Sequence, residues 1–112
     1  MNKVIIKGRI AVEPVQRFIR DDMSVTNFVV AVNRQFRKKD EEQKADFISV
    51  VAWNKQGEFI KNYFSKGQEI LIQGTLRINQ WEGDDGVRRE GCEVLINNID
   101  FCRCITYRLK TF

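Results

Sequence analysis

The sequence predicts an all-β fold, a closed barrel of five strands with a single helix between the third strand and the fourth. Three observations support this prediction. Five apolar, β-branched segments alternate with turn-forming or charged residues. Gly8 and Gly74 lie inside the first and fourth segments, where a barrel strand has to bend. Only the segment after Trp53 has helical spacing, whereas a parallel α/β fold needs several crossover helices.

The first two strands are separated by a turn that contains two consecutive aspartates. Residues 3–10 form the first strand, and we expect Pro14 to interrupt it before a shorter continuation at residues 15–19. The Asp-Asp pair that follows favours a turn. Residues 24–36, which are rich in valine, form the second strand.

The third strand, Ala45–Trp53, has two different faces, because successive side chains of a strand point to opposite sides. Its core face consists of Ile48, Val50 and Ala52. Its other face consists of Phe47, Ser49, Val51 and Trp53. Two large aromatic rings beside a serine suit a half-open surface on which flat ligands can lie. The alternative is that both faces are buried, as in the centre of a small barrel, and this strand alone leaves both interpretations open.

A short helix follows the third strand. We expect Asn54 to be its N-cap and Gly67 to stop it. Apolar residues recur along one stripe of this helix, at Phe59, Ile60, Tyr63 and Phe64. We assign all four to the core, because apolar residues at helical spacing usually pack inside.

The fourth strand, residues 68–81, alternates between an aliphatic row and a more polar row. The aliphatic row consists of Ile70, Ile72, Gly74, Leu76 and Ile78. Trp81 belongs to the other row, together with Arg77 and Asn79. Burial in the core does not account for an aromatic residue on the polar side of a strand, and this favours a ligand-binding role for Trp81. A cap at the barrel rim is the alternative.

Two loop segments carry concentrated charge. Residues 37–44 are almost wholly charged, which fits a basic finger that approaches phosphates or, equally, a solvated hairpin tip whose acids cancel its bases. Residues 82–86 form a turn rather than a cation site, because their carboxylates lack the spacing of a calcium loop. This turn leads into the last strand region, residues 87–104.

The composition fits one soluble domain and excludes several kinds of site. The 112 residues carry a formal net charge of +4, which favours an anionic partner. Histidine, the commonest general base and metal ligand, is absent, and we expect neither an enzyme nor a metal or other cofactor. Cys92, Cys102 and Cys104 form no Cys-x-x-Cys pair, which favours free thiols in a reducing compartment. No signal peptide or membrane span is evident, so we expect a cytoplasmic protein.

The element order matches the oligonucleotide-binding (OB) fold, in which a helix between strands three and four covers one end of the barrel. Sequence-independent binding of single strands needs aromatic platforms, at about 1–3 kcal/mol per stacked base, and cations along the backbone. The candidate platforms are Phe36, Phe47, Trp53 and Trp81. The candidate phosphate ligands are Lys3, Arg34, Arg37, Lys55, Lys66, Arg77, Arg88 and Arg89. Phe36 shares the alternation of Val30 and Val32, so only a bulge or the strand end turns it towards the groove.

Five segments carry a family resemblance over about residues 2–103: NKVIIKGRI at 2–10, AVNRQF at 31–36, DFISVVAW at 46–53, YFSKG at 63–67 and IQGTLRINQW at 72–81. Together they resemble the homotetrameric single-stranded DNA-binding proteins of bacteria and phages. In that family, aromatic residues at the positions of Phe36, Phe47, Trp53 and Trp81 stack on bases. Basic residues at the positions of Lys3, Lys55, Lys66 and Arg77 lie along the DNA.

The resemblance implies one DNA-binding barrel per subunit, which we assign to residues 1–104, and the remaining residues 105–112 form a short basic extension. It also implies assembly through the first strands into a homotetramer, or else a homodimer, with single-stranded DNA wrapped around several barrels. DNA replication, recombination and repair are the implied processes, at the nucleoid. The family usually continues into a flexible tail with acidic residues and a Pro-Phe tip. This sequence ends at Phe112 without them, so we do not expect recruitment of other proteins through such a tail.

Three other functions stay open on the residues alone. A nuclease on the same barrel needs several converging carboxylates, and no acidic residues here have such a spacing. A protein-interaction module would bury Trp53 and Trp81 against a partner. An RNA-binding protein is harder to separate, because stacking does not sense the 2′-hydroxyl group. We expect a preference for single-stranded DNA on the strength of the resemblance.

Overall fold

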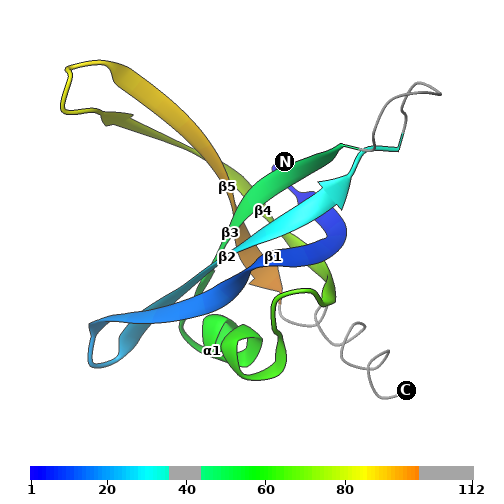
Figure 1. The fold of residues 1–112 in the computed structure, drawn as a ribbon. Coiled ribbons are helices and arrows are strands. Elements are labelled where there is room, and N and C mark those ends of the chain that lie inside the picture. Colours follow the sequence, from blue (N-terminus) through cyan, green and yellow to red (C-terminus); the bar gives the residue numbers. More distant parts are fainter. Residues whose placement is uncertain (36–43, 99–112) are drawn as a thin grey trace.

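The computed structural model describes residues 1–35 and 44–98, which form a closed five-stranded barrel and one helix (Figure 1). The strand order around the barrel is β1-β2-β3-β5-β4; β3 and β5 are parallel, and the other neighbours are antiparallel. The elements are β1 Val4–Arg20, β2 Met23–Asn33, β3 Ala45–Trp53, α1 Asn54–Tyr63, β4 Glu69–Glu82 and β5 Arg88–Asn98. The predicted all-β OB fold, with its helix between strands three and four, is confirmed.

The barrel closes because β1 bends and pairs with a different neighbour on each side of the bend. Residues 4–9 pair with β4, and residues 9–20 pair with β2. A Cβ atom at Gly8 would lie 2.4 Å from the carbonyl oxygen of Ala31, closer than a side chain tolerates. Glycine therefore lets β1 approach β2 closely at the point where its partner changes.

The core lies between the inner faces of the strands and the helix. It consists of Ile10, Phe28, Val30, Val50, Ala52, Ile60, Phe64, Ile70, Ile72, Val94 and Ile96. The predicted core row of the third strand is confirmed, because Val50 and Ala52 are fully buried and the partly buried Ile48 packs against the core. This row fixes the register of β3, since a slip by one residue would turn it towards solvent.

The helix α1 covers one end of the barrel (Figure 1). Ile60 and Phe64 are buried as predicted, and Phe59 packs against the core from the edge. The assignment of Tyr63 to the core is wrong, because this residue is 57% exposed and its ring packs only on the flank, 4.8 Å from the ring of Phe59. The four apolar residues cover a wider part of the helix surface than the small barrel can contact, so the residue at the edge of this stripe is exposed to solvent.

Both predicted ends of the helix need correction. Asn54 is not the N-cap; Trp53 holds that position without a side-chain hydrogen bond. Asn54 instead has a φ of 52°, a region that asparagine tolerates, and its Oδ1 accepts a hydrogen bond from the backbone N–H of Ser24 at 3.0 Å. The helix ends at Tyr63, and Gly67 lies in a later turn with a φ of 95°. The asparagine therefore ties the start of the helix to β2 rather than capping it.

The expected interruption at Pro14 is also wrong, because β1 continues through this residue. The pairing of β1 with β2 shifts between Ile10 and Val12 and again between Val12 and Val15. Pro14 is buried within the second shift. A β-bulge leaves a backbone N–H without a ladder partner, so proline is accepted there without the loss of a hydrogen bond.

Three hairpins extend from the barrel as arms, formed by β1 and β2, by β2 and β3, and by β4 and β5 (Figure 1). Leu76 and Ile78 are 41% and 53% exposed, because β4 leaves the barrel before its aliphatic row ends. Phe36, Arg37 and the other residues at 36–43, together with residues 99–112, lie outside the described part of the chain. Within the described part, no helix is both long and apolar enough to cross a membrane.

Candidate nucleic-acid interface

The strand registers place several predicted side chains on one outer face of the barrel. Cross-strand partners point to the same side of a sheet, so a row of side chains can be followed from strand to strand. One row across β2, β3, β5 and β4 consists of Val29, Ser49, Glu93 and Arg77. By alternation, Phe47 and Trp53 share the side of Ser49, and Trp81 shares the side of Arg77. This surface, which carries Phe47, Trp53, Arg77 and Trp81, is termed the aromatic face.

Two of the aromatic residues lie near opposite ends of β3. Phe47 pairs with Ala31 and is 69% exposed, whereas Trp53 pairs with Val25 and is half-buried beside the helix. Six residues of strand put about 20 Å between them. Folding gains nothing from a phenylalanine that leaves most of its ring in water. The prediction of a half-open surface on this strand therefore holds at Phe47, whereas Val51, between the two rings, is buried.

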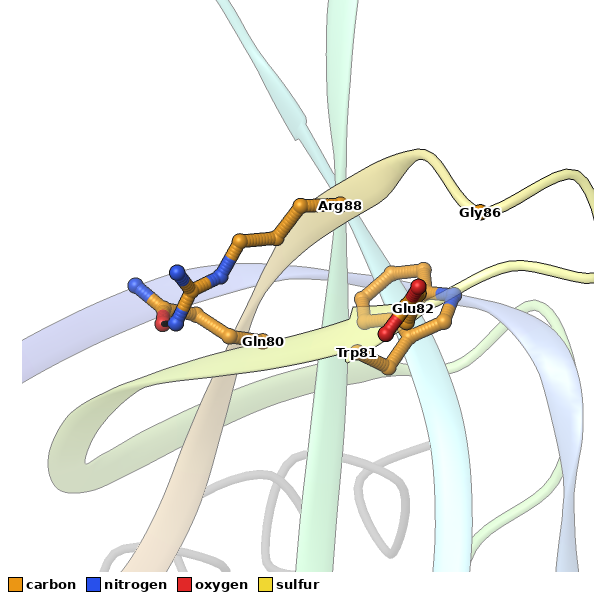
Figure 2. A pocket seen from close by; sticks show the side chains of 5 residues that line it. All are labelled: Gln80, Trp81, Glu82, Gly86 and Arg88. Carbon is orange, nitrogen blue, oxygen red and sulfur yellow. Dashed lines mark hydrogen bonds between the residues drawn. The ribbon is translucent and has the colours of Figure 1, made fainter.

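Trp81 lies on the arm formed by β4 and β5 and is 50% exposed (Figure 2). A Cβ atom at Gly91 would lie 3.2 Å from Cζ3 and 3.3 Å from Cη2 of the indole. The ring thus packs on the β5 backbone, at a residue that has no side chain to displace it. In Figure 2, Gln80 and Arg88 point away from the ring, although all three line an open hollow of about 440 Å³. The backbone contact orients the indole and leaves part of it free for a ligand.

Two of the predicted phosphate ligands lie on the aromatic face. Arg77 is exposed opposite Glu93. Arg89 is directly opposite Trp81, and its Nη2 is 2.8 Å from Oδ2 of Asp85. Their positions allow both guanidinium groups to approach the backbone of a strand whose bases lie on Trp81.

The side chains of Arg34 and Arg88 lie on the sides of their arms that face away from the aromatic rings. The backbone N–H of Arg34 bonds to the carbonyl of Lys44, and its side chain donates to Oδ1 of Asp46 from Nε at 3.2 Å and from Nη2 at 3.0 Å. The hydrogen bond and the charge of Asp46 raise the pKa of Arg34 above its ordinary value. Arg88 donates from Nη2 to Oε1 of Gln80 at 2.8 Å. The structure therefore does not group these two arginines with the aromatic rings.

The three predicted lysines occupy different places. Lys3 is exposed just before the first residue of β1. The side chain of its neighbour Asn2 bonds to the backbone N–H and carbonyl of Leu76, so Lys3 lies near the part of β4 that leads to Arg77. Lys55 is exposed in the first turn of the helix, two residues after Trp53. Lys66 lies apart from the aromatic face, in a turn beside β1, where its backbone N–H donates to Oε2 of Glu13 at 2.7 Å. The roles of Phe36 and Arg37 stay predictions, because both lie outside the described residues.

The structure adds a hollow that the sequence reasoning missed. It has a volume of about 320 Å³ and lies between β1, β2 and β3, beside β5. Its lining residues are Val12, Val15, Asn27, Phe28, Val29, Ser49, Val50, Val51 and Glu93. It joins the aromatic face through Ser49 and Val51 and suits the flat apolar surface of a base. The sequence signal for it is weak, because exposed valines in a strand look like core residues.

Arg17 is a further cation that the sequence reasoning missed. It pairs with Val25, which pairs with Trp53, so the exposed arginine and the indole belong to the same row of side chains. Alternation within residues 15–19 shows only that Arg17 shares a side with Val15. The registers of three strands are needed to connect it with Trp53.

The described residues contain no group of three or more Cys, Asp or Glu side chains placed to hold a metal ion. The arrangement offers planar side chains and cations instead. Such a surface can bind a negatively charged polymer that carries planar groups, and this binding needs no covalent chemistry.

Comparison with known proteins places this surface in a family context. The model described as "Single-strand binding protein family" matches residues 1–102. The single-stranded DNA-binding protein of Clostridium perfringens is 43% identical over 102 residues, which cover 90% of this chain and 65% of that protein. That of Bacillus cereus is 40% identical over 101 residues, which cover 90% of this chain and 59% of that protein. This chain therefore spans less than two thirds of the length of these two relatives.

A solved structure shows the same fold. The chain titled "Plasmodium falciparum SSB complex with ssDNA" superposes with a TM-score of 0.76 at 24% sequence identity, and the match covers 86% of each chain. The sequence match over residues 1–102 shows that the present chain belongs to the single-strand binding protein family.

Proposed function

We propose that this chain binds single-stranded DNA without regard to base sequence and without catalysis. One observation carries the proposal: Phe47 and Trp81 expose 69% and 50% of their surface on the same outer face of a closed barrel. Exposed aromatic rings that share a face have no role in the core, and every base has a planar face to stack on them. The names of the curated relatives support the same ligand.

In this mechanism, bases stack on Phe47, Trp53 and Trp81 while cations neutralise the phosphates between them. Each stacked base contributes about 1–3 kcal/mol. Arg17, Arg77 and Lys55 are exposed near these rings and serve as the phosphate ligands. The apolar hollow beside β3 accepts a base or a sugar on the path between Phe47 and Trp53. Stacking and charge neutralisation both ignore base identity, so the protein protects any exposed single strand during replication, recombination or repair in the cytoplasm.

We further propose that the chain assembles through β1, as a homotetramer or a homodimer. Two features support this. Residues 4–7 pair with β4 along one edge and are paired with no strand on the other edge within the described residues, and Ile5 is 60% exposed there. An unpaired strand edge beside an apolar side chain is a template for a second copy of the strand. Light scattering should give a mass near four or two times the chain mass of 13.2 kDa; a monomer at micromolar concentration would contradict the assembly.

The binding proposal is tested by titrating the two tryptophans with oligo-dT while their fluorescence is recorded at low and moderate salt. We expect strong quenching, because stacked bases quench an indole at Trp53 or Trp81. We also expect affinity to fall as salt rises, with a slope of log K against log salt near −0.7 for each neutralised phosphate. Competition with RNA and duplex DNA of the same sequence measures selectivity.

Three results would contradict the proposal. Absence of quenching, together with no binding in a filter assay, would favour a protein-interaction module in which the tryptophans contact a partner. Equal or tighter binding of RNA or duplex DNA would overturn the assignment of single-stranded DNA. Cleavage of the oligonucleotide by the pure protein in magnesium or calcium would overturn the assignment as a non-enzyme.

A further inference from the structure

The arm that carries Trp81 holds its arginine on an internal carboxylate. Nη2 of Arg89 donates to Oδ2 of Asp85 at 2.8 Å, while Oδ1 of the same carboxylate accepts the backbone N–H of Val87 at 3.0 Å. The pair lies over Gly83, where a Cβ atom would be 3.2 Å from Nη1 of the arginine. The Arg89 guanidinium is therefore fixed against the turn and directly across the hairpin from Trp81.

The arm formed by β2 and β3 carries a similar ion pair, but on the side that faces away from Phe47. Arg34, which follows β2, donates two hydrogen bonds to Oδ1 of Asp46, at 3.2 Å from Nε and 3.0 Å from Nη2. Asp46 directly precedes Phe47 in β3. All four side chains of the two pairs are between 50% and 59% exposed, so water and ligands reach them.

The oxygen atoms of a carboxylate and of a phosphodiester are alternative acceptors for the same guanidinium donors. An exposed ion pair contributes about 0–1 kcal/mol, so it exchanges readily. We infer that Asp85 occupies the position of a DNA phosphate on Arg89 in the free protein, and that binding replaces this carboxylate by a phosphate. This inference rests on the proposed function. It identifies Asp85 as a built-in competitor that lowers affinity.

The exchange has a distinct signature in salt. When a free arginine meets a phosphate, the DNA releases about 0.7 of a counterion, and this release makes binding salt-dependent. When the arginine comes from an aspartate, the freed carboxylate stays beside the DNA and repels it, so the local gain in positive charge and the counterion release are smaller. Removing the carboxylate should therefore both tighten binding and steepen its dependence on salt.

Asp85→Asn tests this inference, and Asp84→Asn is its matched control. Both changes remove one negative charge from the same turn, but Asp84 has no hydrogen bond or ion pair within the described part of the chain. Asparagine at position 85 keeps an oxygen for the N–H of Val87 and is well accepted in turns. We expect Asp85→Asn to bind oligo-dT about two- to five-fold tighter than Asp84→Asn, with a salt slope steeper by up to about 0.7.

The double variant Asp85→Asn/Arg89→Gln should lose this gain, because no arginine is left to release. Equal affinity and slope for Asp85→Asn and Asp84→Asn, with binding intact, would overturn this inference alone. Weaker binding by Asp85→Asn would mean that the aspartate positions Arg89 and would overturn it as well. Failure of the wild-type chain and every variant to bind would overturn the proposed function itself.

Discussion

Trp81→Ala should weaken binding of oligo-dT by about 5- to 150-fold, the loss of about 1–3 kcal/mol for one stacked base. The free energy of unfolding should change by less than about 1 kcal/mol, because the indole is 50% exposed and its contact with Gly91 lies on an arm outside the barrel. Binding is followed by the anisotropy of a labelled oligonucleotide, since the substitution removes one of the two tryptophans. Stability is followed by urea unfolding.

Ile78→Ala provides the matched control for this prediction. Ile78 is 53% exposed on the same arm but points to the other side of β4. Its removal deletes a similar apolar contact without deleting a platform, so affinity should change little. Equal losses of affinity in the two variants would mean that the arm binds by apolar contact alone. Unfolding of Trp81→Ala would mean that the indole stabilises the fold rather than the ligand.

The sequence places Phe47 and Trp81 on the outside of the barrel correctly, because strand alternation is a local property. A period of two assigns each side chain to a face from its immediate neighbours, and burial of the opposite row then fixes which face is outside. Gly8 is predictable for a related reason, since glycine inside an apolar strand has few explanations other than a bend or a close approach. The fold and three of the four aromatic positions thus follow from patterns within about ten residues.

The errors arise where a distant segment decides the outcome. Asn54 has the residue type of a helix cap, but its side-chain oxygen accepts a hydrogen bond from the backbone N–H of Ser24, thirty residues earlier. Pro14 looks like a strand break until the shifted pairing of β1 with β2 places it at a bulge. The turn that holds Lys66 is placed by Glu13, more than fifty residues earlier, and the role of this lysine as a phosphate ligand stays a prediction. A single sequence holds no signal for such contacts.

The ion pairs of the arms are also decided by the folded structure and could not be predicted from the sequence. Arg89 and Asp85 are four residues apart on opposite sides of a turn, and only the geometry of that turn brings them to 2.8 Å. Charge counting treats Arg34 and Arg89 as free cations, whereas both are neutralised in the structure. Arg17 shows the reverse case, because its exposure beside Trp53 emerges only from the registers of three strands.

Gly74→Ala should destabilise the fold by about 3 kcal/mol or more. A Cβ atom there would lie 2.2 Å from the carbonyl oxygen of Leu95 and 2.9 Å from Cγ1 of Val94. The oxygen cannot move alone, because Leu95 pairs with Val51 on one side and with Thr75 on the other. Overpacking usually costs about 1–3 kcal/mol, and a collision with backbone held on both sides belongs at the upper end of that range or beyond. Urea unfolding, monitored by circular dichroism at one protein concentration, measures the loss.

Gly67→Ala separates this steric effect from the general consequences of replacing glycine. Gly67 has a φ of 95° but no other atom within 4 Å of its added Cβ, so its variant bears only the backbone strain, about 1–2 kcal/mol. Gly74 has no positive φ, so its variant bears only the collision. The pairing of β4 with β5 shifts between Gln73 and Gly74, at the residue where an added Cβ would collide with the backbone of β5. If Gly74→Ala were no less stable than Gly67→Ala, β5 would have to yield at Leu95, and barrel closure would not depend on glycine at that shift.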